Sequence, residues 1–268
     1  MRGLAYRFLT DARHFQMLAV FLLILILALN GDFGPDWKVL LLTEASVCIF
    51  QLLFLRHYNV PKKDLRSAVI AGLSITLLLR TNFLGLYVLA AFLVVATKFW
   101  VRFDGKHIFN PSNIAIVLCL LCFSDYAWIS PGQWGSSALF GLTAAFIAFV
   151  VLTKARTADI SLFFLGGWLL LTFGRAFWLG DPMAIPLHQM QNGALLVFAF
   201  FMISDPMTIP DHRAGRAVFA LATAAIGFIL QYEFQVRAGV FYALPIVCMS
   251  TPVLDMLFKH QRYQWGKI

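Results

Sequence analysis

The polar residues at 105–118 (GKHIFNPSNIAIVL) interrupt an apolar sequence and are the first candidates for chemistry. Asn110 followed by Pro111 is typical of a helix start, because an asparagine side chain accepts a hydrogen bond from a free N–H group of the first turn. Such a start carries partial positive charge and binds phosphate or carboxylate groups, so we expect a ligand-binding site here; a plain helix cap is the alternative. The other polar side chains of this site are Lys106, His107, Ser112 and Asn113.

Three charged residues lie in or at the end of other apolar runs: Glu44 in LLTEASVC, Arg80 in LLLRT and Asp205 in MISDP. A charge at the centre of a bilayer costs at least about 2.5–3.5 kcal/mol, so it should pair or face a ligand. We predict that Arg80 and Asp205, with the nearby Thr208, pair or hold one bound group, unless each lies at a membrane surface. Glu44 is a candidate for coupling to a proton or Na⁺, or it is satisfied by a neighbouring hydroxyl.

The composition indicates an all-α integral membrane protein. The chain is 60% hydrophobic and only 13% charged, and its mean hydropathy is +0.79. The net charge of +8 is spread over the connections between apolar runs, so we expect the lipid bilayer as a partner and no nucleic acid. Cys119 and Cys122 lie in an apolar run without a second pair of ligands, so no metal site is predicted.

The apolar segments predict ten transmembrane helices in a single membrane domain, residues 1–268. Seventeen of the 21 Lys and Arg residues lie in the connections on the side of the two chain ends. This asymmetry places both ends in the cytoplasm, which we expect to be that of a bacterial cell with the protein in its inner membrane. The ten segments are 15–30, 38–55, 66–79, 83–101, 112–123, 135–153, 160–177, 193–203, 214–230 and 238–258.

The segment lengths predict an inverted repeat. The third, fifth and eighth segments are too short to cross about 30 Å of hydrocarbon, and the tenth is interrupted by Pro245 and Pro252. Abnormal helices at corresponding positions of two halves are typical of inverted repeats with a site near the midplane. We therefore predict two inverted five-helix repeats, about 15–123 and 135–258. Ordinary tilted helices are the alternative.

Three stretches resemble, in order, the signatures of one family: AGLSITLLLRT, GKHIFNPSNIAIVL and FAFFMISDPMTIP. The family contains the D subunit of the Rnf electron-transport complex and the B subunit of the sodium-pumping NADH:quinone reductase. GKHIFNPSN also resembles the UnbU-type branch. The resemblance implies ten helices in two inverted halves and flavin-based electron transfer coupled to Na⁺ or H⁺ movement. Members carry a threonine esterified to FMN after the fifth helix, but here no threonine precedes Thr143 in that connection, which argues against covalent FMN.

These observations leave three functions open. We favour a membrane subunit of a redox complex that transfers electrons through a noncovalent flavin (FMN or riboflavin) or a quinone, beside other membrane or peripheral redox subunits. Such a subunit has no complete active site of its own, and no catalytic residue is assigned. A transporter or channel of the same fold for a solute or ion, and a non-catalytic scaffold subunit, are the alternatives.

The Arg80–Asp205 pair can be tested by reversing its charges. Arg80→Asp alone should reduce the yield of folded protein in membranes, because it leaves two buried carboxylates together. Adding Asp205→Arg should restore most of that yield, measured by fluorescence-detected size-exclusion chromatography. If the double variant is no better folded than Arg80→Asp, the pair is wrong.

Overall fold

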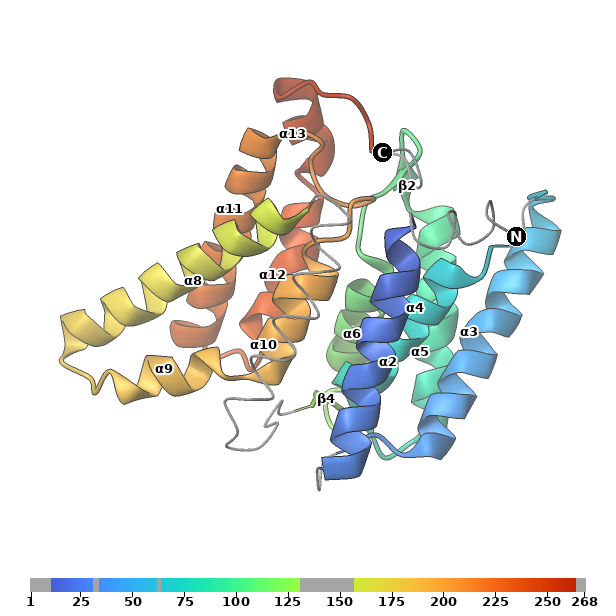
Figure 1. The fold of residues 1–268 in the computed structure, drawn as a ribbon, viewed down its shortest axis with the longest axis horizontal. Helices are drawn as coiled ribbons and strands as arrows, with labels where there is room; N and C mark the ends of the chain where they lie inside the picture. Colours follow the sequence, from blue (N-terminus) through green and yellow to red (C-terminus); the bar gives the residue numbers. More distant parts are fainter. Residues whose placement is uncertain (1–10, 31–33, 62–63, 131–156, 264–268) are drawn as a thin grey trace, which may run out of the picture. The chain divides into compact units, whose positions relative to one another are not determined.

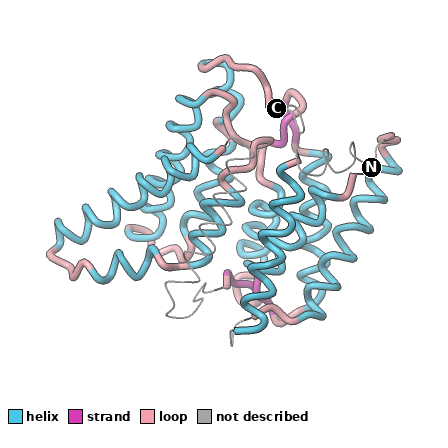
Figure 2. The backbone as a smooth tube through the Cα atoms, viewed as in Figure 1, coloured by secondary structure: helices cyan, strands magenta, loops and turns pink. Residues whose placement is uncertain are grey.

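The chain folds as two compact units of helices. The computed structural model describes residues 11–30, 34–61, 64–130 and 157–263. Unit 1 comprises residues 1–130 and 265–268, and unit 2 comprises residues 131–264 (Figure 1). Helices dominate both units, and the strands of the described residues are short (Figure 2).

The described residues of unit 1 form a bundle of five helices. α3 packs against α4 and α5, α5 also packs against α6, and α2 packs against α4 (Figure 1). Its largest fully buried side chains are aliphatic, among them Ile75 and Ile116. The elements are α2 (Ala12–Asn30), α3 (Trp37–His57), α4 (Arg66–Leu78), β1 (Leu79–Thr81), α5 (Leu84–Trp100), β2 (Arg102–Phe103), β3 (Lys106–His107), α6 (Pro111–Cys122) and β4 (Ala127–Ile129).

The two shortest described helices of unit 1 are each followed by a strand, and these strands pair with each other. α4 has 13 residues and α6 has 12, lengths of about 20 and 18 Å. β1 follows α4 and pairs antiparallel with β4, which follows α6; Arg80 lies opposite Trp128. The amide of Ser130 extends the ladder by donating to the carbonyl of Leu78 at 2.7 Å. The ladder supplies backbone hydrogen bonds that the short helices cannot make for themselves.

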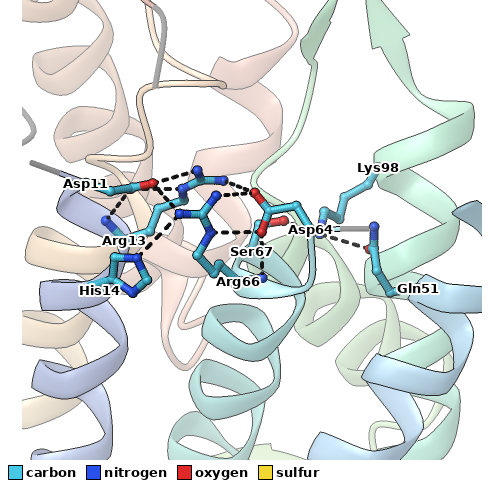
Figure 3. Close-up of polar contacts among 8 residues, drawn as sticks. All are labelled: Asp11, Arg13, His14, Gln51, Asp64, Arg66, Ser67 and Lys98. Carbon is cyan, nitrogen blue, oxygen red and sulfur yellow. Dashed lines mark hydrogen bonds and ion pairs between the residues drawn. The ribbon is translucent and has the colours of Figure 1, made fainter. Parts of the chain in front are cut away.

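A network of four charged side chains joins the starts of α2 and α4 (Figure 3). Arg13 binds Asp11 at 2.7 Å and Asp64 at 2.9 Å, and Arg66 binds the same two carboxylates at 2.6 and 2.7 Å. Each arginine thus bridges Asp11, directly before α2, and Asp64, two residues before α4. Hydrogen bonds from Arg66 hold the pKa of Asp64 below its ordinary value, although burial opposes the shift.

Unit 2 is built around α11. This helix packs against α8 and α12, and α8 contacts α9 and η1. α11 and α12 approach closely because glycine faces glycine: a Cβ on Gly239 would lie 2.7 Å from the carbonyl oxygen of Gly227. The elements are α8 (Ala158–Leu179), α9 (Ala184–Met190), α10 (Gly193–Val197), the π-helix η1 (Phe198–Met202), α11 (Arg213–Tyr232), α12 (Gly239–Cys248) and α13 (Thr251–Leu257).

The interior of unit 2 is aromatic. Phe198 lies between Phe164 and Phe241, with ring centroids 5.1 and 5.2 Å away. Phe164 also stacks on Trp168. All four rings are at most 2% exposed. Contacts of this kind contribute beyond the area that the rings bury, so they hold α8, η1 and α12 together.

Helices occur at nine of the ten predicted segments, and the sixth, 135–153, lies outside the described residues. By length and composition, α3, α8 and α11 are able to cross a membrane, as is the bent pair α12–α13. These apolar helices confirm a membrane protein, whereas ten spans and the inverted repeat stay predictions. The four short strands found in the described part of the chain, and α9, were not predicted.

The break in the tenth segment differs in detail from the expectation. Pro245 lies inside α12 without ending it, and the chain bends by 52° between α12 and α13. The break falls at Met249 and Ser250, and Pro252 stands at the first turn of α13. Proline is tolerated in a first turn, so Pro252 marks the new helix start, and Pro245 is not the point of interruption.

Asp64→Asn should weaken the link between α2 and α4. Losing the charge-assisted bonds from both arginines should cost about 1–2 kcal/mol at pH 7, measured by thermal unfolding in detergent. Because the pKa of Asp64 is lowered by folding, its contribution is complete above the unfolded pKa of about 4 and is lost as the pH falls below it. The variant should therefore lose less stability than the wild type on acidification.

Asp125→Asn is the matched control, because Asp125 is exposed in the same unit. It should unfold like the wild type at each pH. Equal acid sensitivity of Asp64→Asn and the wild type would contradict a stabilising role for the network.

Candidate functional site

The start of α6 is a capped helix held by a tight hairpin. Asp104 and Gly105 both have positive φ, at 45° and 79°, and turn β2 into β3; Asp-Gly is a residue pair that favours this turn. Asn110 then caps α6: its side-chain oxygen accepts the amide of Asn113 at 3.0 Å and the hydroxyl of Ser112 at 3.1 Å. The predicted helix start at Pro111 is confirmed.

The side chains before the cap are largely inside the unit. Lys106 is 7% exposed, and the Nδ1 atom of His107 is buried. Burial, with the charges of Lys98 and Arg102, lowers the pKa of His107 to about 3, so the ring is neutral at physiological pH. Its Nδ1 has no hydrogen-bond partner among the described residues. His107 therefore offers a buried ring nitrogen to a ligand.

A buried lysine adjoins this region. Lys98, in the last turn of α5, is 5% exposed. Its ammonium group donates to the hydroxyl of Ser67 at 3.0 Å and to Oε1 of Gln51 at 3.3 Å (Figure 3). The three groups bring α3, α4 and α5 together at the end of unit 1 that also carries the β2–β3 hairpin.

Arg80 lies at the other end of α5, in β1. Its guanidinium donates to the carbonyl of Thr76 at 2.9 Å, so the cation caps the carbonyl end of α4. The hydroxyl of Tyr87 donates to the carbonyl of Leu79, three residues after Thr76, at 3.2 Å. The 17 residues of α5 separate Arg80 from Lys106 and His107 by about 25 Å. Arg80 and the α6 start are therefore two separate places.

Both carboxylate oxygens of Glu44, in α3 of unit 1, are buried. Glu44 faces α4 at Gly72, where a Cβ would lie 2.6 Å from Glu44 Oε1. Neither carboxylate oxygen has a hydrogen-bond partner among the described residues. Two hydroxyls on the same helices, those of Thr43 and Thr76, likewise lack partners in the described part of the chain. The expected alternative, a hydroxyl bonded to Glu44, is not found there.

Asp205 and Thr208 form a turn after η1 in unit 2. Asp205 Oδ1 accepts the amide of Met207 at 3.0 Å, and its carbonyl accepts the hydroxyl of Thr208 at 3.1 Å. Thr251, the first residue of α13, donates to the carbonyl of Thr208 at 3.0 Å. The end of the short helix pair α10–η1 is thereby tied to the break between α12 and α13.

The predicted site residues thus occupy several places: the α6 start, β1 and α3 in unit 1, and the turn after η1 in unit 2. The Arg80–Asp205 pair would join the two units and stays a prediction. Gly72 and Lys98 were missed as site residues. Lys98 lies near the end of the predicted apolar segment 83–101, and that position was a signal that its stem is buried. No group of three or more His, Cys, Asp or Glu side chains able to hold a metal ion occurs among the described residues.

Comparison with known families matches residues 125–264 to the NQR2, RnfD, RnfE family, just over half of the chain. The match runs from the residues before β4 through unit 2 and includes Asp205 and Thr208. Arg80, Glu44 and the α6 start lie before it. No curated protein matches the chain.

Proposed function

Because the chain belongs to the NQR2, RnfD, RnfE family, we propose that it is a membrane subunit of a redox complex that passes electrons through a noncovalent flavin or a quinone. The family is associated with membrane subunits of the Rnf and Nqr redox complexes, and the apolar helices make this chain a multi-pass membrane protein. Other membrane or peripheral subunits of the complex would supply and remove the electrons. The UnbU-type branch, the inner membrane and the cytoplasmic ends belong to the same proposal.

The proposal includes two inverted five-helix repeats. In unit 1 the end of short helix α4 is tied to the end of α6 through β1 and β4. In unit 2 the end of α10–η1 is tied to the break before α13 through Thr251 and Thr208. The predicted repeat relates the third helix to the eighth and the fifth helix to the tenth. Each half therefore makes the corresponding connection. This parallel supports the repeat.

The residues at the α6 start fit a cofactor in part. The hydroxyl of Ser112 and the amide of Asn113 both bond to Asn110, so they serve the helix cap. The Nδ1 of His107 remains for the polar edge of a flavin or quinone ring. A bound flavin or quinone would supply one-electron chemistry; the part of His107 would be to orient it.

Glu44 carries the proposed coupling to ion movement. A charged carboxylate without hydrogen bonds in apolar surroundings is costly, so this group should hold a proton or a cation. Gly72 supports the role because it lets α4 approach the carboxylate closely enough to shield it from lipid. The hydroxyls of Thr43 and Thr76 are oxygen donors on the same two helices, and oxygen is what Na⁺ requires.

The cofactor is tested by the visible spectrum of the purified protein. We expect a flavin spectrum that leaves with the supernatant after acid precipitation, or a quinone in the organic extract. His107→Ala should reduce the amount retained at least about tenfold, since one buried hydrogen bond is lost. His188→Ala, at an exposed position of α9, is the matched control and should retain it. Protein with neither flavin nor quinone would refute the proposal.

The ion-coupling role is tested by infrared difference spectroscopy of the protein in lipid. Adding Na⁺ or raising the pH should remove a carboxylic-acid C=O band, and Glu44→Gln should lack that band. Glu233→Gln is a matched control, because Glu233 is the other glutamate of the chain and is exposed. A band that persists in Glu44→Gln, or one that responds to neither Na⁺ nor pH, would exclude Glu44 as the exchanging group.

A further inference from the structure

Unit 1 carries an aromatic and basic patch where α3 and α5 end. The patch consists of Arg56, Tyr58, Trp100, Arg102 and Phe103. Its three rings are 47%, 60% and 53% exposed, respectively, and both arginines are exposed. Such a cluster of exposed rings is uncommon unless it meets a partner or a membrane.

The rings of the patch are fixed in place. Trp100 Nε1 donates to the hydroxyl of Tyr58 at 3.1 Å. Tyr58 also stacks on Phe99, with centroids 5.3 Å apart and an angle of 20° between the planes. Phe54 contacts Tyr58, Phe99 and Trp100. The patch is therefore an ordered surface made by two helices and the hairpin that follows α5.

Each arginine lies two positions along the chain from a ring of the patch, Arg56 from Tyr58 and Arg102 from Trp100. The side chain of Arg56 has no hydrogen bond or ion pair among the described residues. Nη2 of Arg102 donates a hydrogen bond to the carbonyl of Gly105 at 3.0 Å, which fixes the guanidinium at the hairpin turn. The other N–H groups of this guanidinium are left to bind a ligand. The turn also carries the carboxylate of Asp104, which is exposed. Two arginines and amphipathic rings thus occur together where α3 and α5 end.

We propose that this patch binds the headgroup of an anionic phospholipid. α3 has 21 residues, a length of about 31 Å, so its end lies at the boundary of the hydrocarbon layer. Trp and Tyr favour that depth, and arginine N–H groups bond to lipid phosphate. The ring of Phe103 would contact the acyl chains. This end of unit 1 is the one predicted to face the cytoplasm, where anionic lipids attract basic residues.

The proposal is independent of the redox function, and it is distinct from binding of a soluble phosphate. A free anion would use the arginines but would leave the exposed rings in water. A phospholipid uses both, because its phosphate meets the cations while its glycerol and chains cover the rings. The distinguishing property is that the acyl chains add to the affinity.

The test is titration of the delipidated full chain with phosphatidylglycerol or phosphatidylcholine, followed by native mass spectrometry. We expect the wild type to prefer phosphatidylglycerol. Arg56→Gln with Arg102→Gln should weaken phosphatidylglycerol binding about 30-fold, since each arginine near an anionic surface contributes about a factor of five. Binding of phosphatidylcholine should be unchanged.

Two further variants keep the result interpretable. Arg56→Lys with Arg102→Lys retains the charges and should keep most of the preference. Lys38→Gln is the matched control, because Lys38 is an exposed cation beside Trp37 at the opposite end of α3; it should bind like the wild type. Equal phosphatidylglycerol affinity in the glutamine variant, or full displacement of the lipid by inorganic phosphate, would overturn the proposal.

Discussion

A backbone group that leaves a helix in apolar surroundings needs a hydrogen-bond partner, and this requirement governs where the short helices of this protein end. In unit 1, the carbonyls at the end of α4 are satisfied by the β1–β4 ladder, by Tyr87 and by Arg80. In unit 2, the hydroxyls of Ser161 and Ser204 bond to the carbonyls of Ala199 and Phe200 in the π-helix. Irregular backbone is thus placed where side chains or another strand can complete it.

This constraint changes the interpretation of Arg80. A cation near the middle of a bilayer is a candidate for ligand binding, but Arg80 also completes the fold by bonding to the carbonyl of Thr76. The same holds for Asp205 and Thr208, whose polar atoms close a turn. Glu44 differs from these groups, since its carboxylate forms no hydrogen bond among the described residues. The distinction separates polar groups whose hydrogen bonds complete the fold from the carboxylate that we propose to exchange an ion.

Much of the fold was predictable because its signals are local. The length of an apolar run, the Asn110–Pro111 start and the turn residues all lie within a few positions of the element that they define. The pairing of β1 with β4 was not predictable, since 45 or more residues separate the partners and neither strand has a strong sequence pattern. Glu44 was found as a charge in an apolar run, whereas the role of Gly72 depends on how α3 and α4 approach each other.

The different interiors of the two units have a spectroscopic consequence. Among the described tryptophans, Trp168 is the buried one, at 2% exposure, and it lies within the aromatic interior of unit 2. Trp37, Trp100, Trp128 and Trp178 are all exposed on the surface. Near-ultraviolet circular dichroism depends on immobilised rings in asymmetric surroundings, so Trp168 makes unit 2 visible by this method. The surface tryptophans report instead on the polarity of the lipid or detergent around them, which gives the interior and the exterior separate optical signals.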